Sequence, residues 1–241
     1  AAAAVNRGSV DQMLAKPATR EELLKVLTEA AELNWQRVSE RSFRNRLPAD
    51  MGEMSVEMQN GLARGEFSLV YQPQIHLGTR EIVGYEALMR WNSTRYGNVS
   101  PSVFIRIAEL NGFIVPLTEW ALSEAATRLA GWLDDGMAPV RVAVNVCPQH
   151  LQSGDLYRSV QQVLQATALP PELLEIEVTE SEQIDSPAEF IREIGLLNKL
   201  GIAVSLDDFG SGFCSLSHVE RFQVSKLKID KSLVDGLRRG A

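Results

Sequence analysis

The sequence has few of the features that mark secreted or membrane-spanning proteins. Its two cysteines, Cys147 and Cys214, lie far apart and form no C-x-x-C pattern, which argues against a disulfide framework or a cysteine zinc module. No apolar run approaches the roughly 20 residues that cross a bilayer, and the N-terminus lacks a signal-peptide pattern. We therefore expect a soluble protein of the reducing cytoplasm with no membrane partner.

Positive charge is also scarce. The chain has 24 Lys and Arg against 31 Asp and Glu, which gives a net charge of −7 over 241 residues. Such a chain has no global attraction for a nucleic-acid polymer, so any anionic ligand must be held by local groups or a metal. Three histidines, His76, His150 and His218, lack the close spacing of a metal-binding set. The composition is otherwise that of an ordinary globular protein.

The first 53 residues differ in pattern from the rest. Residues 15–33 predict a turn and an amphipathic helix, in which Thr19 and Glu22 have capping-box spacing. Residues 34–53 are polar and predict a helical connector. From about Met54 short apolar runs alternate with helical patterns, so we expect the main domain to occupy 54–241.

The alternation after Met54 predicts an α/β fold with parallel strands and crossover helices. The expected strands are 67–75, 82–91, 140–146, 173–180, 202–209 and 226–230, and the expected helices are 101–111, 117–134, 155–166 and 187–200. A doubly wound open sheet and a closed barrel both produce this order. Polar residues occur on nearly every strand, which favours the barrel, because all its strand ends meet at one mouth.

Polar residues interrupt five of the expected strands. They are Glu86, Asn145, Glu177, the pair Asp207 and Asp208, and Lys228. Burying an unpartnered charge is costly, so their recurrence indicates a shared site. Their carboxylate and amide oxygens suit Mg²⁺ or Mn²⁺, and two such ions sharing carboxylates can hydrolyse a phosphodiester.

Three observations extend this candidate site. Gly210 and Gly212 follow the two aspartates closely and permit a turn that could aim both carboxylates at one mouth. Lys228 could lie beside a metal-bound water or a phosphate oxygen. Arg90 follows Glu86 by four residues, and it could grip a phosphate or pair with a carboxylate.

Several motifs together resemble those of the EAL-domain phosphodiesterases, which cleave cyclic di-GMP. In order they are Tyr71-Gln72-Pro73, Glu86-Ala87-Leu88-Met89-Arg90-Trp91, Pro101-x-x-Phe104-Ile105, Asn145-Val146, Glu177-Val178-Thr179-Glu180-Ser181, Asp207-Asp208-Phe209-Gly210-Ser211-Gly212 and Lys228-Ile229-Asp230. The resemblance covers the chain from about Met54 to its end. It implies a (β/α)₈ TIM-like barrel with one reversed strand, which opens cyclic di-GMP to linear pGpG with Mg²⁺ or Mn²⁺, two ions per site.

The resemblance also implies a role for each matching residue. Glu86, Asn145, Glu177 and Asp207 correspond to ligands of a first metal, Asp208 to a ligand of the second, Lys228 to the lysine that holds the hydrolytic water, and Gln72 and Arg90 to substrate contacts. Glu180, Phe209 and Gly210 match segments that couple metal binding to dimerisation, which implies a homodimer. Cys147 stands where serine is common, and we expect it beside the site without binding metal.

The two ends of the sequence lead to further expectations. Lys16-Pro17 and the helix that follows resemble the last strand and helix of a flavodoxin-like response-regulator receiver domain. Residues 1–33 would then be the remnant of such a domain, which implies two-component control by an upstream histidine kinase. No segment after Lys228 matches the last two barrel strands, including the family's Glu-Gly-Val-Glu-like segment, so we expect the sequence to be part of a longer protein.

Two other functions fit the same residues. A degenerate EAL domain would bind cyclic di-GMP as a sensor or interaction module without cutting it. An unrelated Mg²⁺-dependent barrel enzyme of the enolase type would also place carboxylates on successive strands.

Overall fold

The computed structural model describes residues 51–179, 187–209 and 222–231. The expected receiver remnant at 1–33 lies outside these residues, as does nearly all of the expected connector at 34–53. Residues 51–53 form the start of helix α3 (Met51–Ala63), so this helix spans the boundary expected between the connector and the main domain.

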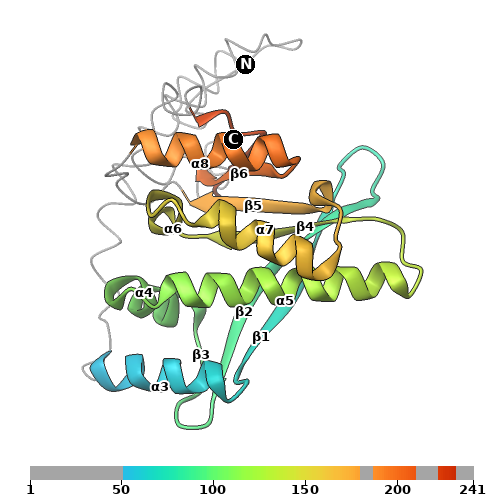
Figure 1. The fold of residues 1–241 in the computed structure, drawn as a ribbon. Helices are drawn as coiled ribbons and strands as arrows, with labels where there is room; N and C mark the ends of the chain where they lie inside the picture. The colour runs from blue at the N-terminus through green and yellow to red at the C-terminus, as the bar shows by residue number, and fades with distance from the viewer. Residues whose placement is uncertain (1–50, 180–186, 210–221, 232–241) are drawn as a thin grey trace, which may run out of the picture.

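One mixed sheet forms the centre of the described fold (Figure 1). Its strands are β1 (Phe67–Ile75), β2 (Ile82–Ser93), β3 (Gly97–Val99), β4 (Arg141–Val146), β5 (Leu174–Thr179), β6 (Ala203–Phe209) and β7 (Lys226–Ile229). The order is β1-β2-β4-β5-β6-β7, with β3 pairing with β2. β1 is antiparallel to β2, whereas β4 to β7 follow β2 in parallel. The α/β prediction is confirmed, and β1 and the three-residue β3 are the strands that run antiparallel to β2.

Helices separate most of the parallel strands and cover one face of the sheet. They are α4 (Pro101–Asn111), α5 (Ile114–Asp134), α6 (Pro148–Gln152), α7 (Leu156–Thr167) and α8 (Pro187–Leu200), with a 3-10 turn η2 (Pro171–Leu173) before β5. Figure 1 shows α5, α7 and α8 lying side by side over the sheet. Gly201 ends α8 with a φ of 97°, a left-handed conformation that glycine adopts without strain.

The main hydrophobic core lies between the sheet and these helices. Alternate strand residues, including Val142, Val144, Ile176, Val178 and Val204, are buried against the helices. At the other end of the core the rings of Phe67 and Trp91 stack with centroids 5.4 Å apart, and Phe104 meets both edge-on. Within the described ranges no helix combines the length and the apolar stretch of a bilayer-spanning segment.

The opposite side of the sheet carries polar side chains. Successive strand residues point to opposite faces, so the register places a second set of residues away from the helices. This set, which we name the polar face, consists of Gln72, Gln74, Glu86, Arg141, Asn145, Glu175, Glu177, Ser205, Asp207, Lys226 and Lys228. The fold thus separates a helix-covered core from a face rich in titratable groups.

Candidate functional site

Three carboxylates from three strands meet on the polar face. Glu86 of β2, Glu177 of β5 and Asp207 of β6 each offer an oxygen within 4.8 Å of the other two, and we name them the carboxylate triad. The side chain of Glu177 is 0% exposed, and those of Glu86 and Asp207 are 18% and 16% exposed. Residues 121 positions apart in the sequence are therefore brought together, as expected from the interrupted strands.

The ammonium group of Lys228 lies among the three carboxylates. Its Nζ is 3.0 Å from Glu86 Oε2, 2.5 Å from Glu177 Oε2 and 2.7 Å from Asp207 Oδ2. Burial opposes the charged form of this lysine, but hydrogen bonds to Asp207 and Glu177 outweigh burial and raise its pKa above the usual range. Lys228 therefore stays positively charged at every physiological pH.

Glu177 has a strongly perturbed carboxyl group. Burial raises its pKa to about 7, and the nearby charges of Glu86 and Asp207 add to this effect against the opposing influence of Lys228. The group therefore changes charge near neutral pH.

An irregularity near the end of β6 places a second aspartate beside the triad. Asp208 has a φ of 55°, which is unusual for a residue with a side chain, and its backbone N–H donates to Asp207 Oδ1 at 2.8 Å. Burial, followed by the charge of Asp207, raises the pKa of Asp208 to about 6. This left-handed residue lies at a register shift between Leu206 and Phe209 and interrupts the strand alternation, whereas the turn predicted at Gly210 and Gly212 lies outside the described residues.

Asn145 completes the set of oxygen donors. Its Nδ2 donates to Glu86 Oε1 at 2.9 Å, so its amide orients the first carboxylate of the triad and keeps its own oxygen available. Carboxylate and amide oxygens are hard ligands of the kind that Mg²⁺ and Mn²⁺ prefer. The cluster found among the described residues contains no histidine or cysteine. The residues present therefore fit a hard divalent cation.

A pocket opens next to this cluster. It has a volume of about 150 Å³ and is lined mostly by apolar groups of β2, β4, α4 and α5. Arg90 lines it and donates from Nη1 to the carbonyl of Met89 at 2.8 Å, and no described carboxylate forms an ion pair with this arginine. Cys147 is buried and lines the same pocket beside Asn145, so it lies near the site without joining the triad.

The other predicted site residues occupy different surroundings. Gln72 lies directly opposite Glu86 in the β1–β2 register, and its side chain is exposed on the polar face. Phe209 is 1% exposed at the end of β6, so its ring belongs to the core. Glu180 and Gly210 lie outside the described residues.

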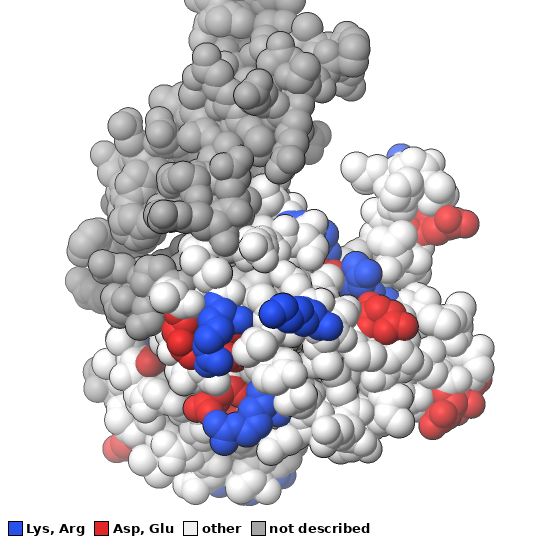
Figure 2. Space-filling view, turned by 45° about the horizontal axis from the view of Figure 1, so that its top comes forward, with Lys and Arg blue, Asp and Glu red and all other residues white. Residues whose placement is uncertain are grey.

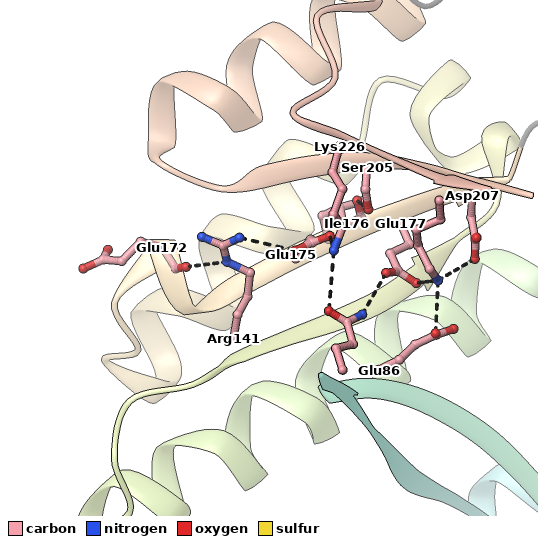
Figure 3. Close-up of polar contacts among 11 residues, drawn as sticks. Glu86, Arg141, Glu172, Glu175, Ile176, Glu177, Ser205, Asp207 and Lys226 are labelled. Carbon is pink, nitrogen blue, oxygen red and sulfur yellow. Dashed lines mark hydrogen bonds and ion pairs between the residues drawn. The ribbon is translucent and has the colours of Figure 1, made fainter. Parts of the chain in front are cut away.

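A second polar cluster, which the sequence reading missed, lies one step below the triad. We name Gln74, Arg141, Glu175 and Lys226 the lower tier. Lys226 Nζ is 2.6 Å from Glu175 Oε1, and Arg141 Nη1 is 3.5 Å from Glu175 Oε2 (Figure 3). Glu175 and Lys226 each precede a predicted site residue by two positions, so strand alternation could have found them.

Charged side chains of both signs lie on the face of the molecule that Figure 2 shows. Lysine and arginine side chains lie beside acidic ones there, and neither sign covers a large area of the described part. On that face an anionic ligand would be attracted by particular groups rather than by a broad positive surface.

Comparisons with known proteins show which family the chain belongs to. The profile of the EAL domain matches residues 55–241. The chain is 35% identical over 182 residues to the oxygen sensor protein DosP of Escherichia coli. The aligned segment covers 76% of the chain and 23% of DosP. It is 34% identical over 181 residues to MucR of Pseudomonas aeruginosa, which is named a bifunctional diguanylate cyclase and cyclic di-GMP phosphodiesterase. The aligned segment covers 75% of the chain and 26% of MucR. The chain thus spans about a quarter of the length of these relatives.

Solved structures agree with the sequence comparison. A structure of the PaMucR phosphodiesterase in complex with cyclic di-GMP superposes with a TM-score of 0.71 at 34% identity, over 77% of the chain and 75% of that structure. The EAL enzyme Bd1971, with cAMP and cyclic di-GMP bound, superposes with a TM-score of 0.70 at 25% identity, over 89% of the chain and 61% of that structure.

Proposed function

Because the chain belongs to the EAL domain family, we propose that it is a metal-dependent phosphodiesterase that hydrolyses cyclic di-GMP to linear pGpG. The observation that carries the proposal is the convergence of three carboxylates, an amide and a charged lysine on one face of the sheet. Relatives that cover most of this chain include MucR, whose name describes it as a cyclic di-GMP phosphodiesterase.

The donor set divides between two cations in this proposal. Glu86, Asn145, Glu177 and Asp207 hold a first Mg²⁺ or Mn²⁺, and Asp208 serves a second. Bound there, the cations supply a water that ionises near neutral pH and neutralise charge on the phosphate. The raised pKa of Glu177, about 7, makes loss of its proton part of cation binding.

Lys228 is proposed to orient a bound water or phosphate oxygen rather than to remove a proton. Its raised pKa keeps three N–H donors on Nζ, so it cannot act as a general base at neutral pH. Contacts of 3.0 Å or less to three carboxylates hold the ammonium when no cation is bound. In the proposed reaction a cation would take over these carboxylates, and the freed donors would hold the attacking water or a phosphate oxygen.

The substrate has groups that match the surroundings of the triad. Arg90 lines the neighbouring pocket and can offer its guanidinium to a phosphate, while the apolar walls suit the face of a planar base. Gln72, opposite Glu86, is proposed as a second substrate contact. These local groups hold a dianionic dinucleotide although the chain as a whole carries a net charge of −7.

The test is substitution of a triad carboxylate. With Mn²⁺ and cyclic di-GMP we expect pGpG from the wild-type protein by chromatography, and only background product from Glu86→Gln, which keeps the side-chain size but removes a charged ligand. Glu172→Gln, on an exposed side chain before β5, is the matched control and should retain full turnover. Wild-type turnover in Glu86→Gln would refute the assignment of the site.

A second candidate function is cyclic di-GMP binding without hydrolysis. Lys228 already neutralises part of the triad charge, and an arrangement of this kind is compatible with a binding module. Calorimetry that shows binding together with chromatography that shows no pGpG in Mg²⁺ or Mn²⁺ would favour this candidate over the enzyme.

Control by a receiver domain, and assembly as a homodimer, form part of the same proposal. Residues 1–33 resemble the end of a receiver, so phosphorylation upstream should change the rate through the connector at 34–53. An acyl-phosphate donor added to the full-length protein tests this. Equal rates with and without the donor would contradict the proposed control.

A further inference from the structure

The lower tier is linked to the carboxylate triad through one side chain. Gln74 Nε2 donates to Glu177 Oε1 at 3.4 Å, and Gln74 Oε1 accepts from Lys226 Nζ at 3.5 Å. Lys226 in turn forms the 2.6 Å ion pair with Glu175. A continuous chain of polar contacts therefore runs from the lower tier to a proposed metal ligand.

The two partners of Gln74 determine which way its amide faces. The NH₂ group donates and the oxygen accepts, so the donor must face the Glu177 carboxylate and the acceptor must face the Lys226 ammonium. The reversed amide would place oxygen against oxygen and NH₂ against NH₃⁺. The ion pair between Lys226 and Glu175 thus holds Gln74 in the one orientation that supports Glu177.

The lower tier is itself anchored to the sheet. Glu175 lies on β5 two residues before Glu177. Its side chain is 2% exposed and lies between Lys226 and Arg141. Arg141 Nε also donates to the carbonyl of Glu172 at 3.3 Å (Figure 3). A buried carboxylate with two cationic partners is held in place, because moving it away from either partner would leave its buried charge poorly compensated.

A glycine beside Gln74 allows strand β4 to approach closely. Gly84 is the cross-strand partner of Gln74, and a Cβ at this position would lie 3.5 Å from Gln74 Oε1 and 2.8 Å from the carbonyl oxygen of Arg141. The absence of a side chain at Gly84 lets the Arg141 carbonyl of β4 approach β2, whereas the distance to Gln74 is an ordinary van der Waals contact.

We propose that Gln74, held by the Lys226–Glu175 ion pair, is a positioning residue that fixes Glu177 Oε1 and so presents Glu177 Oε2 to the proposed cation. The inference rests on the proposed function and adds a residue to it. Outer partners that orient a metal ligand commonly change metal affinity by about 10-fold to 100-fold when they are removed. Gln74 is a long neutral amide outside the triad, so its loss should weaken cation binding without removing a ligand.

The test compares Gln74→Met with Gln165→Met in the full-length protein. Gln165 is exposed on α7, one of the helices that cover the other face of the sheet, and provides the matched control. We expect Gln74→Met to raise the Mn²⁺ concentration at half-saturation in calorimetry by about 10-fold. The Mn²⁺ concentration at half-maximal pGpG formation should rise in parallel, with a smaller change in KM for cyclic di-GMP at saturating Mn²⁺.

A second pair of variants separates positioning from folding. Lys226→Arg preserves the positive charge beside Glu175 and should keep the Mn²⁺ half-saturation near the wild-type value. Lys226→Met combined with Glu175→Gln removes the ion pair without leaving a lone buried charge, and it should weaken Mn²⁺ binding as Gln74→Met does. Thermal melting of each variant in EDTA reports whether the fold is intact.

The outcomes distinguish this inference from the proposed function. Unchanged Mn²⁺ half-saturation in a folded Gln74→Met protein overturns the positioning role, even if the wild type forms pGpG. The same weakening in Gln165→Met overturns it as well, because the effect would not be local. A wild type that binds Mn²⁺ but forms no pGpG removes the proposed hydrolysis and leaves the positioning role to be decided by calorimetry.

Discussion

Lys228 should contribute to stability most strongly when no divalent cation is bound. Its ammonium contacts Glu86, Glu177 and Asp207, and the side chain of Glu177 is 0% exposed. Lys228→Met leaves these three carboxylates near one another without their cationic partner. Breaking a buried charge cluster by removing one partner costs roughly 3 to 5 kcal/mol, and the partial exposure of Lys228, at 22%, favours the lower end.

A loss of about 3 kcal/mol corresponds to a measurable shift in melting temperature. For a domain of this size each kcal/mol moves Tm by about 2–4 °C, so we expect a decrease of about 6–12 °C for Lys228→Met in EDTA. The effect should be larger at pH 8 than at pH 6. Burial raises the pKa of Glu177 to about 7 even though Lys228 lowers it, so loss of the lysine raises this pKa further. At pH 6 the carboxyl is then protonated in the variant, which relieves the repulsion, whereas at pH 8 the wild type gains the ion pair that the variant lacks.

Added Mn²⁺ should narrow the difference between the two proteins. A ligand at about 100 times its Kd stabilises the folded state by about 2.7 kcal/mol, and in the variant the cation need not displace an ammonium group. Lys199→Met, on an exposed lysine of α8, is the control and should melt like the wild type. Equal melting of Lys228→Met and wild type in EDTA would refute the reasoning, as would a difference that Mn²⁺ leaves unchanged.

Three further substitutions test other parts of the structure. Gly84→Ala should lower the free energy of unfolding by about 1–3 kcal/mol in urea titrations, because its Cβ would lie 2.8 Å from the Arg141 carbonyl oxygen; wild-type stability would contradict this. Burial lowers the pKa of His150, so the unfolded chain binds the extra proton and stability should fall as pH drops below about 6.5; His150→Gln should flatten that pH dependence, and an unchanged slope would assign it elsewhere. Asp208→Gly should stay within about 1 kcal/mol of wild-type stability, since relief at φ 55° offsets the added freedom of the unfolded chain, yet lose pGpG formation; retained turnover would exclude Asp208 from the site.

The sequence predicted the larger elements because each carries a clear period. The ranges expected for β1, α4 and α8 agree with those observed, and the other long strands and helices differ by a few residues at their ends. The elements that were missed include β3, with three residues, and α6, with five, which are too short for a hydrophobic period to develop. Helix α3 was missed because its apolar residues were taken as the start of the domain without a helical assignment.

The site was predicted as a set of residues but not as a geometry. Glu86, Glu177, Asp207 and Lys228 stood out because charge is rare in buried strands, and the structure brings these four together. Glu175 and Lys226 were not singled out from the sequence, and each is one of the first two residues of its strand. Strand alternation assigns them to the polar face, yet their 2.6 Å ion pair depends on the β5–β6–β7 register, which only the folded chain provides.

Because β1 runs antiparallel to β2, the order of its residues across the polar face is opposite to that on the parallel strands. On the parallel strands the later residue of each pair lies nearer the triad, as Glu177 does relative to Glu175. On β1 the earlier residue, Gln72, lies opposite Glu86, and the later Gln74 lies opposite Gly84, one level deeper. Lengthening or shortening the β1–β2 hairpin by a two-residue register step would therefore move one glutamine to the level of the other while both stay on the polar face. A change in hairpin length would thus exchange the proposed substrate contact and the proposed support of Glu177 between the two levels, while both amino acids stay glutamine.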